Sequence, residues 1–184
     1  IGNFGIEPNF LPSSMFDFQK YVSEYAIKKG RCAVFLDTGL GKTIIELTIA
    51  ANYRTKTNKP VLIITPLAVA FQFLKEAEKF GIDDIEYSKD GKYKSKIVIC
   101  NYERLHYFNA TDFDCVILDE SSILKNFDGA IKQMVTTFLK KVPSFNSINP
   151  NVFESLIVRT QPSIQISLPA YFSFCLYRSF KITF

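Results

Sequence analysis

The 184-residue sequence has few of the side chains from which metal and nucleophilic sites are commonly built. It contains one histidine and four cysteines, and no two cysteines form a CxxC pair. This excludes a structural zinc site of the usual spacing, and it excludes a Ser-His-Asp site unless His106 serves it. Cys32, Cys100 and Cys115 lie in apolar runs. We expect them to be buried, reduced thiols, which suits an intracellular protein.

Long hydrophobic runs are also absent. The longest apolar stretch, residues 166–177, is too short to span a bilayer and is interrupted by Pro169. We therefore expect no membrane partner. No signal peptide is visible, and because the chain begins with Ile1 we expect a fragment or a processed product.

The net charge is small: 22 Lys and Arg residues stand against 18 Asp and Glu residues, a balance of +4. This balance permits nucleic-acid binding without arguing for it. The charges are unevenly spread, since residues 144–184 carry only four of them. We expect an N-terminal extension at 1–13, an organised domain at 14–143, and a tail at 144–184. The tail is either a genuine divergent segment, an incomplete continuation of the same domain, or the product of a truncation or frame shift.

Short β-branched runs alternate with longer amphipathic runs between residues 14 and 143. Nearly continuous apolar strands are typical of a sheet covered on both faces, and strand-helix alternation is typical of parallel pairing. The sequence thus predicts an α/β fold of three layers, with a mainly parallel sheet and helices on both faces. The predicted strands are 31–36, 61–65, 96–100 and 115–119, and the predicted helices are 15–29, 43–53, 68–80 and 128–141.

A glycine-containing loop follows the first predicted strand and opens the next helix. Backbone N–H groups in such a loop bind phosphate oxygens, and its glycines allow positive φ. The strict phosphate-loop pattern has glycine at the position of Leu36, so the alternative is an ordinary strand-turn-helix connection with a surface lysine. On the phosphate-binding interpretation the loop residues are Asp37, Thr38, Gly39, Leu40, Gly41, Lys42 and Thr43. Lys42 would contact the β and γ phosphates, and Thr43 would place its hydroxyl on Mg²⁺.

Two adjacent carboxylates, Asp119 and Glu120, end the fourth predicted strand. A carboxylate at the carboxyl end of a parallel strand faces the crevice where ligands bind. Asp119 could hold Mg²⁺ through water, and Glu120 could deprotonate the water that attacks the γ-phosphate. Alone, such a pair is more often a helix cap or part of a solvated loop.

Together these residues resemble the first motor domain of superfamily-two helicases, in particular Swi/Snf-type translocases and phage-type DEAD/DEAH-like helicases. Residues 37–43 match the D-x-G-x-G-K-T form of the phosphate loop (Walker A) in that family, which lacks the leading glycine. Residues 119–126 resemble the acidic motif (Walker B) D-E-[AS]-H-x-[IL]-K-N. Ser122 replaces its histidine, a position often credited with coupling the nucleotide and DNA sites. The resemblance covers about residues 14–143 and implies a RecA-like P-loop domain.

The resemblance also implies roles for looser matches. Gln19 corresponds to the glutamine that recognises the adenine edge, and its alternative is a polar residue on an amphipathic helix. The segments after the second and third strands resemble motifs that contact the nucleic-acid backbone, though each could equally be a cap or a turn. The residues concerned are Thr65, Pro66, Asn101 and Tyr102. The catalytic residues implied are Lys42, Asp119 and Glu120.

The function implied is the ATP-binding domain of a DNA-dependent ATPase, with ATP and Mg²⁺ as cofactors. Its partners would be DNA, expected to be double-stranded, and a second RecA-like domain that this chain lacks and that supplies an arginine. We expect the fragment to bind nucleotide and hydrolyse it poorly. The location implied is the cytoplasm of a bacterial or phage-infected cell, or the nucleus of a eukaryote. Alternatives are the motor of a restriction-type translocase and a non-enzymatic remnant that binds nucleotide or DNA.

Overall fold

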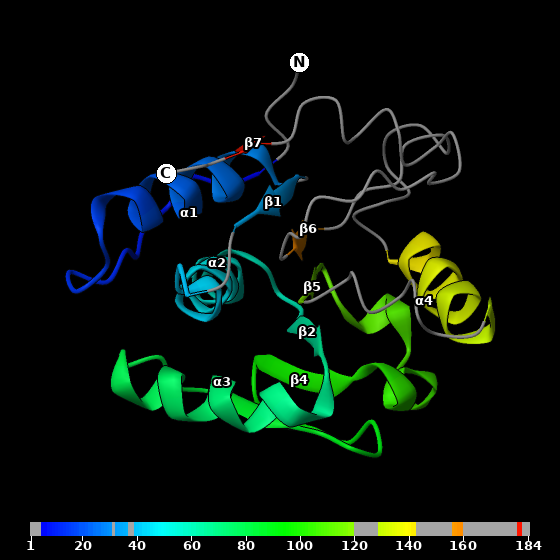
Figure 1. Cartoon of the computed structure of the whole chain (residues 1–184). Helices are drawn as coiled ribbons and strands as arrows, with labels where there is room; N and C mark the ends of the chain where they lie inside the picture. Colours follow the sequence, from blue (N-terminus) through cyan, green and yellow to red (C-terminus); the bar gives the residue numbers. More distant parts are fainter. Residues whose placement is uncertain are drawn as a thin grey trace.

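The computed structural model describes residues 5–30, 32–36, 39–119, 129–142, 156–159 and 180–181. Helices and strands alternate along most of this chain (Figure 1). The α-helices are α1 (Asp17–Lys29), α2 (Lys42–Lys56), α3 (Leu67–Lys79) and α4 (Gly129–Lys141), and the 3₁₀ helices are η1 (Tyr102–Tyr107) and η2 (Ala110–Asp112). The strands are β1 (Ala33–Phe35), β2 (Val61–Thr65), β3 (Ile85–Tyr87), β4 (Ile97–Asn101), β5 (Cys115–Leu118), β6 (Leu156–Arg159) and β7 (Phe180–Lys181).

These strands form one sheet in the order β3-β4-β2-β5-β6-β1-β7, and every pairing between them is parallel. The predicted fold class is therefore confirmed. Because the strands run in one direction, the loops that follow them all emerge at the same edge of the sheet.

Side chains that alternate along the central strands divide the core in two. On β2, Val61 and Ile63 pack with α1, α2 and α3, whereas Leu62 and Ile64 pack with η1, η2 and α4. Figure 1 shows the corresponding layers, with α4 on the opposite side of the sheet from α1, α2 and α3. All five residues of β2 and of β4 are buried, as expected for strands covered on both faces.

The four predicted strands and four predicted helices are all present, with ends that differ by a few residues. The sequence did not predict β3, β7 or the two 3₁₀ helices. The sequence assigns no element to residues 156–159, and the structure inserts them as β6 between β5 and β1. The described parts of the tail thus pair with the same sheet as the rest of the domain.

Among the described cysteines, Cys100 is buried, Cys32 and Cys115 are partly exposed, and all three are free thiols. Desolvation raises the pKa of Cys115 to about 12 and raises that of Cys100 further. Thiols held protonated in this way are poor nucleophiles. None of the described helices is both long and apolar enough to cross a bilayer.

In addition to the backbone bonds from Gly5 and Ile6 to the end of α1, one buried side chain, Asn52 of α2, makes four of the hydrogen bonds near the segment before α1. Its Oδ1 accepts hydrogen bonds from the backbone N–H groups of Asn9 and Phe10 at 2.7 and 3.0 Å. Its Nδ2 donates to the carbonyls of Phe10 and Thr48, each at 2.7 Å. Asn52 therefore satisfies backbone groups of a segment that has no regular structure of its own.

Replacing Asn52 with leucine keeps the number and branching of the side-chain heavy atoms and removes these four bonds. We expect the free energy of unfolding to fall by about 3 kcal/mol, because buried backbone groups lose their partners. Urea unfolding followed by far-UV circular dichroism measures the change. The control is Asn58→Leu, at an exposed position beyond the end of the same helix, which should change stability by about 0.5 kcal/mol or less. Equal losses in both variants would contradict the role of Asn52.

Candidate nucleotide-binding site

The described part of the loop between β1 and α2 has two glycines with positive φ, a conformation compatible with a phosphate-binding turn. Gly39 and Gly41 have φ angles of +81° and +71°, in the region that side-chain-bearing residues rarely adopt. A Cβ built on Gly39 would meet nothing within 4 Å, so open space lies over the loop at this point. Both glycines are required by the turn, and Gly39 leaves room for a ligand.

The N-terminus of α2 faces this loop without a side-chain cap. Gly41 is the N-cap residue, and the first turn of the helix contains no acidic residue. The first N–H groups of a helix lack intrahelical partners and carry partial positive charge, so they attract anions. Lys42 and Thr43 are the first two residues of the helix and are partly exposed. This end of α2 is suited to phosphate oxygens.

Leu36, at the position where the strict phosphate-loop pattern has glycine, lies in the hydrophobic core. Its side chain is 1% exposed and belongs to the core cluster on the α1–α3 side of the sheet. The position therefore acts as an extension of β1, and the turn begins after it. This explains how the loop tolerates leucine there.

Gln19, predicted to recognise adenine, lies directly against the loop. Its Oε1 accepts a hydrogen bond from the Phe16 N–H at 3.0 Å, and its Nε2 donates to the Leu40 carbonyl at 3.0 Å. Gln19 is 6% exposed, and beyond these two bonds its side-chain amide has a second N–H and its oxygen a second lone pair. The structure thus shows Gln19 in contact with the loop through the Leu40 carbonyl.

Asp119 follows β5 at the same edge of the sheet and is 6% exposed. Its Oδ2 accepts a hydrogen bond from the Thr65 hydroxyl at 2.7 Å, and its backbone carbonyl accepts one from the Tyr102 hydroxyl at 2.5 Å. Its backbone N–H donates to the Ile64 carbonyl at 2.9 Å. Both the main chain and the carboxylate of Asp119 are therefore held in place.

The donor set suits Mg²⁺ bound together with a nucleotide. Within the part of the chain that the structure describes, no three His, Cys, Asp or Glu side chains converge to hold a metal. Mg²⁺ is commonly bound by one or two carboxylates completed by water and substrate phosphates. A single buried carboxylate beside a phosphate loop fits that mode and does not fit a metal held by protein ligands alone.

The loop and Asp119 follow strands separated only by β6. Adjacent strands lie about 4.8 Å apart, so the ends of β1 and β5 are roughly 10 Å apart, a distance that a metal-bound triphosphate can bridge. The predicted site residues Asp37, Thr38 and Glu120 lie outside the described residues.

The four residues predicted to contact nucleic acid are placed at the same edge but are mostly covered. Thr65 and Tyr102 are fully buried, Asn101 is 4% exposed, and Pro66 is partly exposed. Asn101 accepts a hydrogen bond from the Tyr87 hydroxyl at 2.8 Å and donates one to Glu103.

The hydroxyls of Thr65 and Tyr102 contact Asp119 instead of the surface. The exposed groups at these turns belong to the residues that follow, Leu67, Glu103 and Arg104 among them.

The lysine-containing run at 89–96 forms the connection between β3 and β4. Because these two strands are parallel, the run is a crossing loop and cannot be a hairpin. The Glu86 carboxylate accepts hydrogen bonds from the backbone N–H groups of Ser95 and Lys94, which hold its pKa below the usual value. The lysines of the run are exposed, as expected for a solvated loop.

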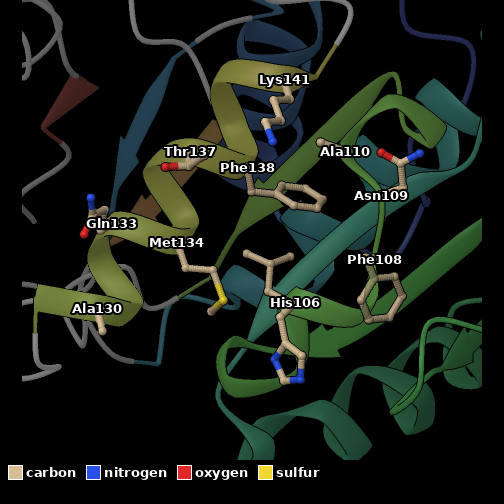
Figure 2. Close-up of a pocket in the computed structure, with 11 residues that line it drawn as sticks. His106, Phe108, Asn109, Ala110, Ala130, Gln133, Met134, Thr137, Phe138 and Lys141 are labelled. Carbon is tan, nitrogen blue, oxygen red and sulfur yellow. The ribbon is translucent and has the colours of Figure 1, made fainter.

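A separate hollow of about 470 Å³ lies between α4 and the η1–η2 segment. Figure 2 shows its lining, which includes Phe108, Met134, Phe138 and Lys141. His106 of η1 also lines it and is exposed. None of the predicted site residues takes part, so the hollow is distinct from the nucleotide site.

The sequence interpretation missed one exposed aromatic residue beside the loop. Phe16 precedes α1, is 70% exposed, and stacks on Phe18 with ring centres 6.1 Å apart. Its backbone N–H contacts Gln19. An aromatic residue three positions before a glutamine was the available signal, because an exposed ring beside a base-recognising amide offers a stacking surface.

These features define a class of protein: a RecA-like P-loop domain of the superfamily-two helicase type. Comparison with known families agrees. The family described as "Type III restriction enzyme, res subunit" matches residues 13–140, and the chain belongs to this family. It is a helicase ATPase-type domain, and its fold is that of the N-terminal domain of superfamily-two helicases.

Curated relatives of the chain are much longer proteins. The Xenopus tropicalis "SWI/SNF-related matrix-associated actin-dependent regulator of chromatin subfamily A-like protein 1" is 30% identical over 141 residues, which cover 71% of this chain and 15% of that protein. The mouse "DNA annealing helicase and endonuclease ZRANB3" is 28% identical over 153 residues, covering 73% and 14%. The chain thus spans about one seventh of the length of these relatives.

Two solved structures share the fold. The UvsW helicase of bacteriophage T4 superposes with a TM-score of 0.60 at 14% identity, over 86% of this chain and 56% of that chain. The Sulfolobus solfataricus SWI2/SNF2 ATPase core, solved in complex with dsDNA, gives a TM-score of 0.63 at 19% identity, over 85% and 34%.

The contact between Gln19 and the loop can be tested at Gly41. A Cβ at Gly41 would lie 2.4 Å from Gln19 Nε2, whereas a Cβ at Gly81, with a similar φ of +67°, would meet nothing within 4 Å. Both alanine variants incur the strain of positive φ, roughly 1–2 kcal/mol. Gly41→Ala should cost about 1 kcal/mol more, because Gln19 must move and lose its hydrogen bond to Leu40.

Urea unfolding of the two variants measures this difference. In a Gln19→Ala background, the extra cost of Gly41→Ala should disappear. Equal costs for Gly41→Ala and Gly81→Ala in the original chain would show that Gln19 does not constrain the loop.

Proposed function

We propose that the chain binds ATP as its Mg²⁺ complex and forms the first motor domain of a DNA-dependent ATPase. The observation that carries this proposal is the glycine turn at Gly39–Gly41, open at Gly39, which leads into a helix without a side-chain cap at the sheet edge where Asp119 is buried. Three independent features at one place, namely anion-binding amides, a lysine and a fixed carboxylate, match what a metal-bound triphosphate requires.

Each residue has a distinct task in this proposal. The amides of the loop and the ammonium of Lys42 hold the β and γ phosphates. Thr43 and Asp119 hold the Mg²⁺, which when bound neutralises charge that develops on the phosphates. Glu120 orients and deprotonates the attacking water. Asp37 and Thr38 complete the loop.

In this proposal the base of the nucleotide lies at the N-terminal end of α1. The amide of Gln19 would pair with the adenine edge, and the exposed ring of Phe16 would stack on the face of the base. Because Gln19 also bonds to Leu40, binding of the base and the conformation of the phosphate loop would be linked through one side chain.

The proposed partner is double-stranded DNA, contacted through its backbone by the turns after β2 and β4. Support comes from the relatives, since one is described as a DNA annealing helicase and one solved neighbour is bound to dsDNA. In such motors a second RecA-like domain supplies an arginine that raises the rate of hydrolysis by roughly 10³–10⁵. The chain by itself should therefore bind nucleotide and turn it over slowly.

A second candidate is the motor of a restriction-type translocase. The description of the matching family, a subunit of a type III restriction enzyme, favours it. The nucleotide site would be the same and the partners would differ. Co-purification with a nuclease or methyltransferase subunit, or genes for these beside the coding sequence, would distinguish the two candidates.

Removing the Lys42 ammonium tests the nucleotide site. Lys42→Ala should weaken binding of a fluorescent ATP analogue in the presence of Mg²⁺ by about 100-fold, because a charge-assisted contact worth about 3 kcal/mol is lost. Fluorescence anisotropy measures the dissociation constant. Lys56→Ala, at the exposed far end of the same helix, is the control and should bind like the original chain. Unchanged binding by Lys42→Ala would remove the central assignment.

DNA dependence separates a motor domain from a non-enzymatic remnant. Duplex DNA should stimulate ATP hydrolysis by a version of the chain that includes a second motor domain, and should have less effect on residues 1–184 by themselves, because in such motors an arginine of the second domain contributes to the rate. Phosphate release measures the rate. If the extended version shows no stimulation, the chain is a binding remnant and not a motor.

A further inference from the structure

Two buried hydroxyl groups converge on Asp119 from neighbouring strands. Thr65 is the last residue of β2 and Tyr102 is the first residue after β4, and both side chains are completely buried. The Thr65 hydroxyl donates to one carboxylate oxygen of Asp119, and the Tyr102 hydroxyl donates to its backbone carbonyl. Both interactions link residues far apart in the sequence.

The order of the strands explains why these side chains meet. β2 pairs with β4 on one side, where Thr65 lies opposite Asn101, and with β5 on the other, where Ile64 lies opposite Leu118. The residue after Leu118 therefore emerges beside Thr65. The longer side chain of Tyr102 reaches the same residue from the next strand of the sheet, on the core side that includes Leu118.

Burial restricts what these two hydroxyls can do. Neither side chain has surface to offer to a nucleic acid, so their hydrogen bonds act within the domain. A ligating carboxylate is oriented by the groups that donate to it, and losing such an outer partner typically weakens metal binding by about 10- to 100-fold. The oxygen that accepts from Thr65 is fixed, which also fixes the direction of the other oxygen.

We infer that Thr65 and Tyr102 are positioning residues of the nucleotide site, which orient Asp119 toward the Mg²⁺ of the bound nucleotide. The inference rests on the proposed function, and it assigns to these residues a role other than contact with nucleic acid. Thr65 acts on the carboxylate directly. Tyr102 acts on the backbone that carries it.

A magnesium titration of nucleotide binding tests the inference on the whole chain. The measured quantity is the Mg²⁺ concentration that gives half of the metal-dependent gain in affinity for a fluorescent ATP analogue. Thr65→Val should raise this concentration about 10-fold or more, and Thr65→Ser, which restores a hydroxyl, should stay within about threefold of the original chain. Affinity measured without Mg²⁺ should be unchanged in both variants, since the hydroxyl acts through the metal.

Matched controls separate positioning from packing. Thr48 is also fully buried, and its hydroxyl contacts the Met15 sulfur instead of Asp119, so Thr48→Val should leave the magnesium dependence unchanged. Tyr102→Phe should raise the half-point by about threefold to tenfold, less than Thr65→Val, because it frees only the backbone. The corresponding control is Tyr53→Phe, which loses the hydrogen bond from the Tyr53 hydroxyl to the Ile27 carbonyl and should keep the half-point of the original chain.

The outcomes distinguish the two proposals. If the original chain binds the analogue and Lys42→Ala does not, but Thr65→Val keeps the original magnesium half-point, the inference is overturned and the proposed function stands. The same holds if Thr65→Val loses affinity equally with and without Mg²⁺. If Thr65→Val fails to fold, the half-point of Tyr102→Phe decides. Absence of nucleotide binding in the original chain overturns both proposals.

Discussion

The parallel alignment of the strands is the constraint on which the rest of this structure depends. Because all the described pairings run in one direction, the loops after β1, β2, β4 and β5 reach a single edge of the sheet. The groups that the proposed chemistry needs, namely loop amides, a lysine and a carboxylate, each follow the end of a strand. A single antiparallel strand among these four would move its loop to the opposite edge, about five residues or 16 Å away.

A second theme is that three buried polar side chains have defined hydrogen-bond partners. Asp119 accepts from Thr65, Gln19 bridges Phe16 and Leu40, and Asn52 satisfies four backbone groups. Unpaired polar groups in such positions would destabilise the fold, so each must be fixed by its neighbours. The same bonds set directions: they decide where a carboxylate points, how the phosphate loop is held and where the N-terminal segment runs. Stability and preorganisation of the proposed site therefore have a common origin.

The position of the chain in its family gives these features a context. The matching family covers residues 13–140, and curated relatives carry this domain as a small part of much longer proteins. Leu36, which precedes the phosphate-loop residues, is buried in the core, and Ser122 stands where the resembled acidic motif has histidine. A site whose acidic residue is anchored by Thr65 and Tyr102 would depend on the domain itself for its orientation, while catalytic rate would depend on a partner domain.

The sequence by itself determined the four central strands, the four helices, their layered parallel arrangement and the candidate phosphate loop. It could do so because β-branched runs, helical periodicity and the glycine-lysine-threonine turn are local signals. Only the tertiary structure decided that β6 lies between β5 and β1, that Asn52 anchors residues 9–10, and that Gln19 touches the loop. It also decided that Thr65 and Tyr102 turn inward to Asp119, although Leu67 and Glu103, which follow them closely in the sequence, are exposed. These outcomes depend on contacts between residues 17 to more than 100 positions apart, and no local pattern encodes such pairings.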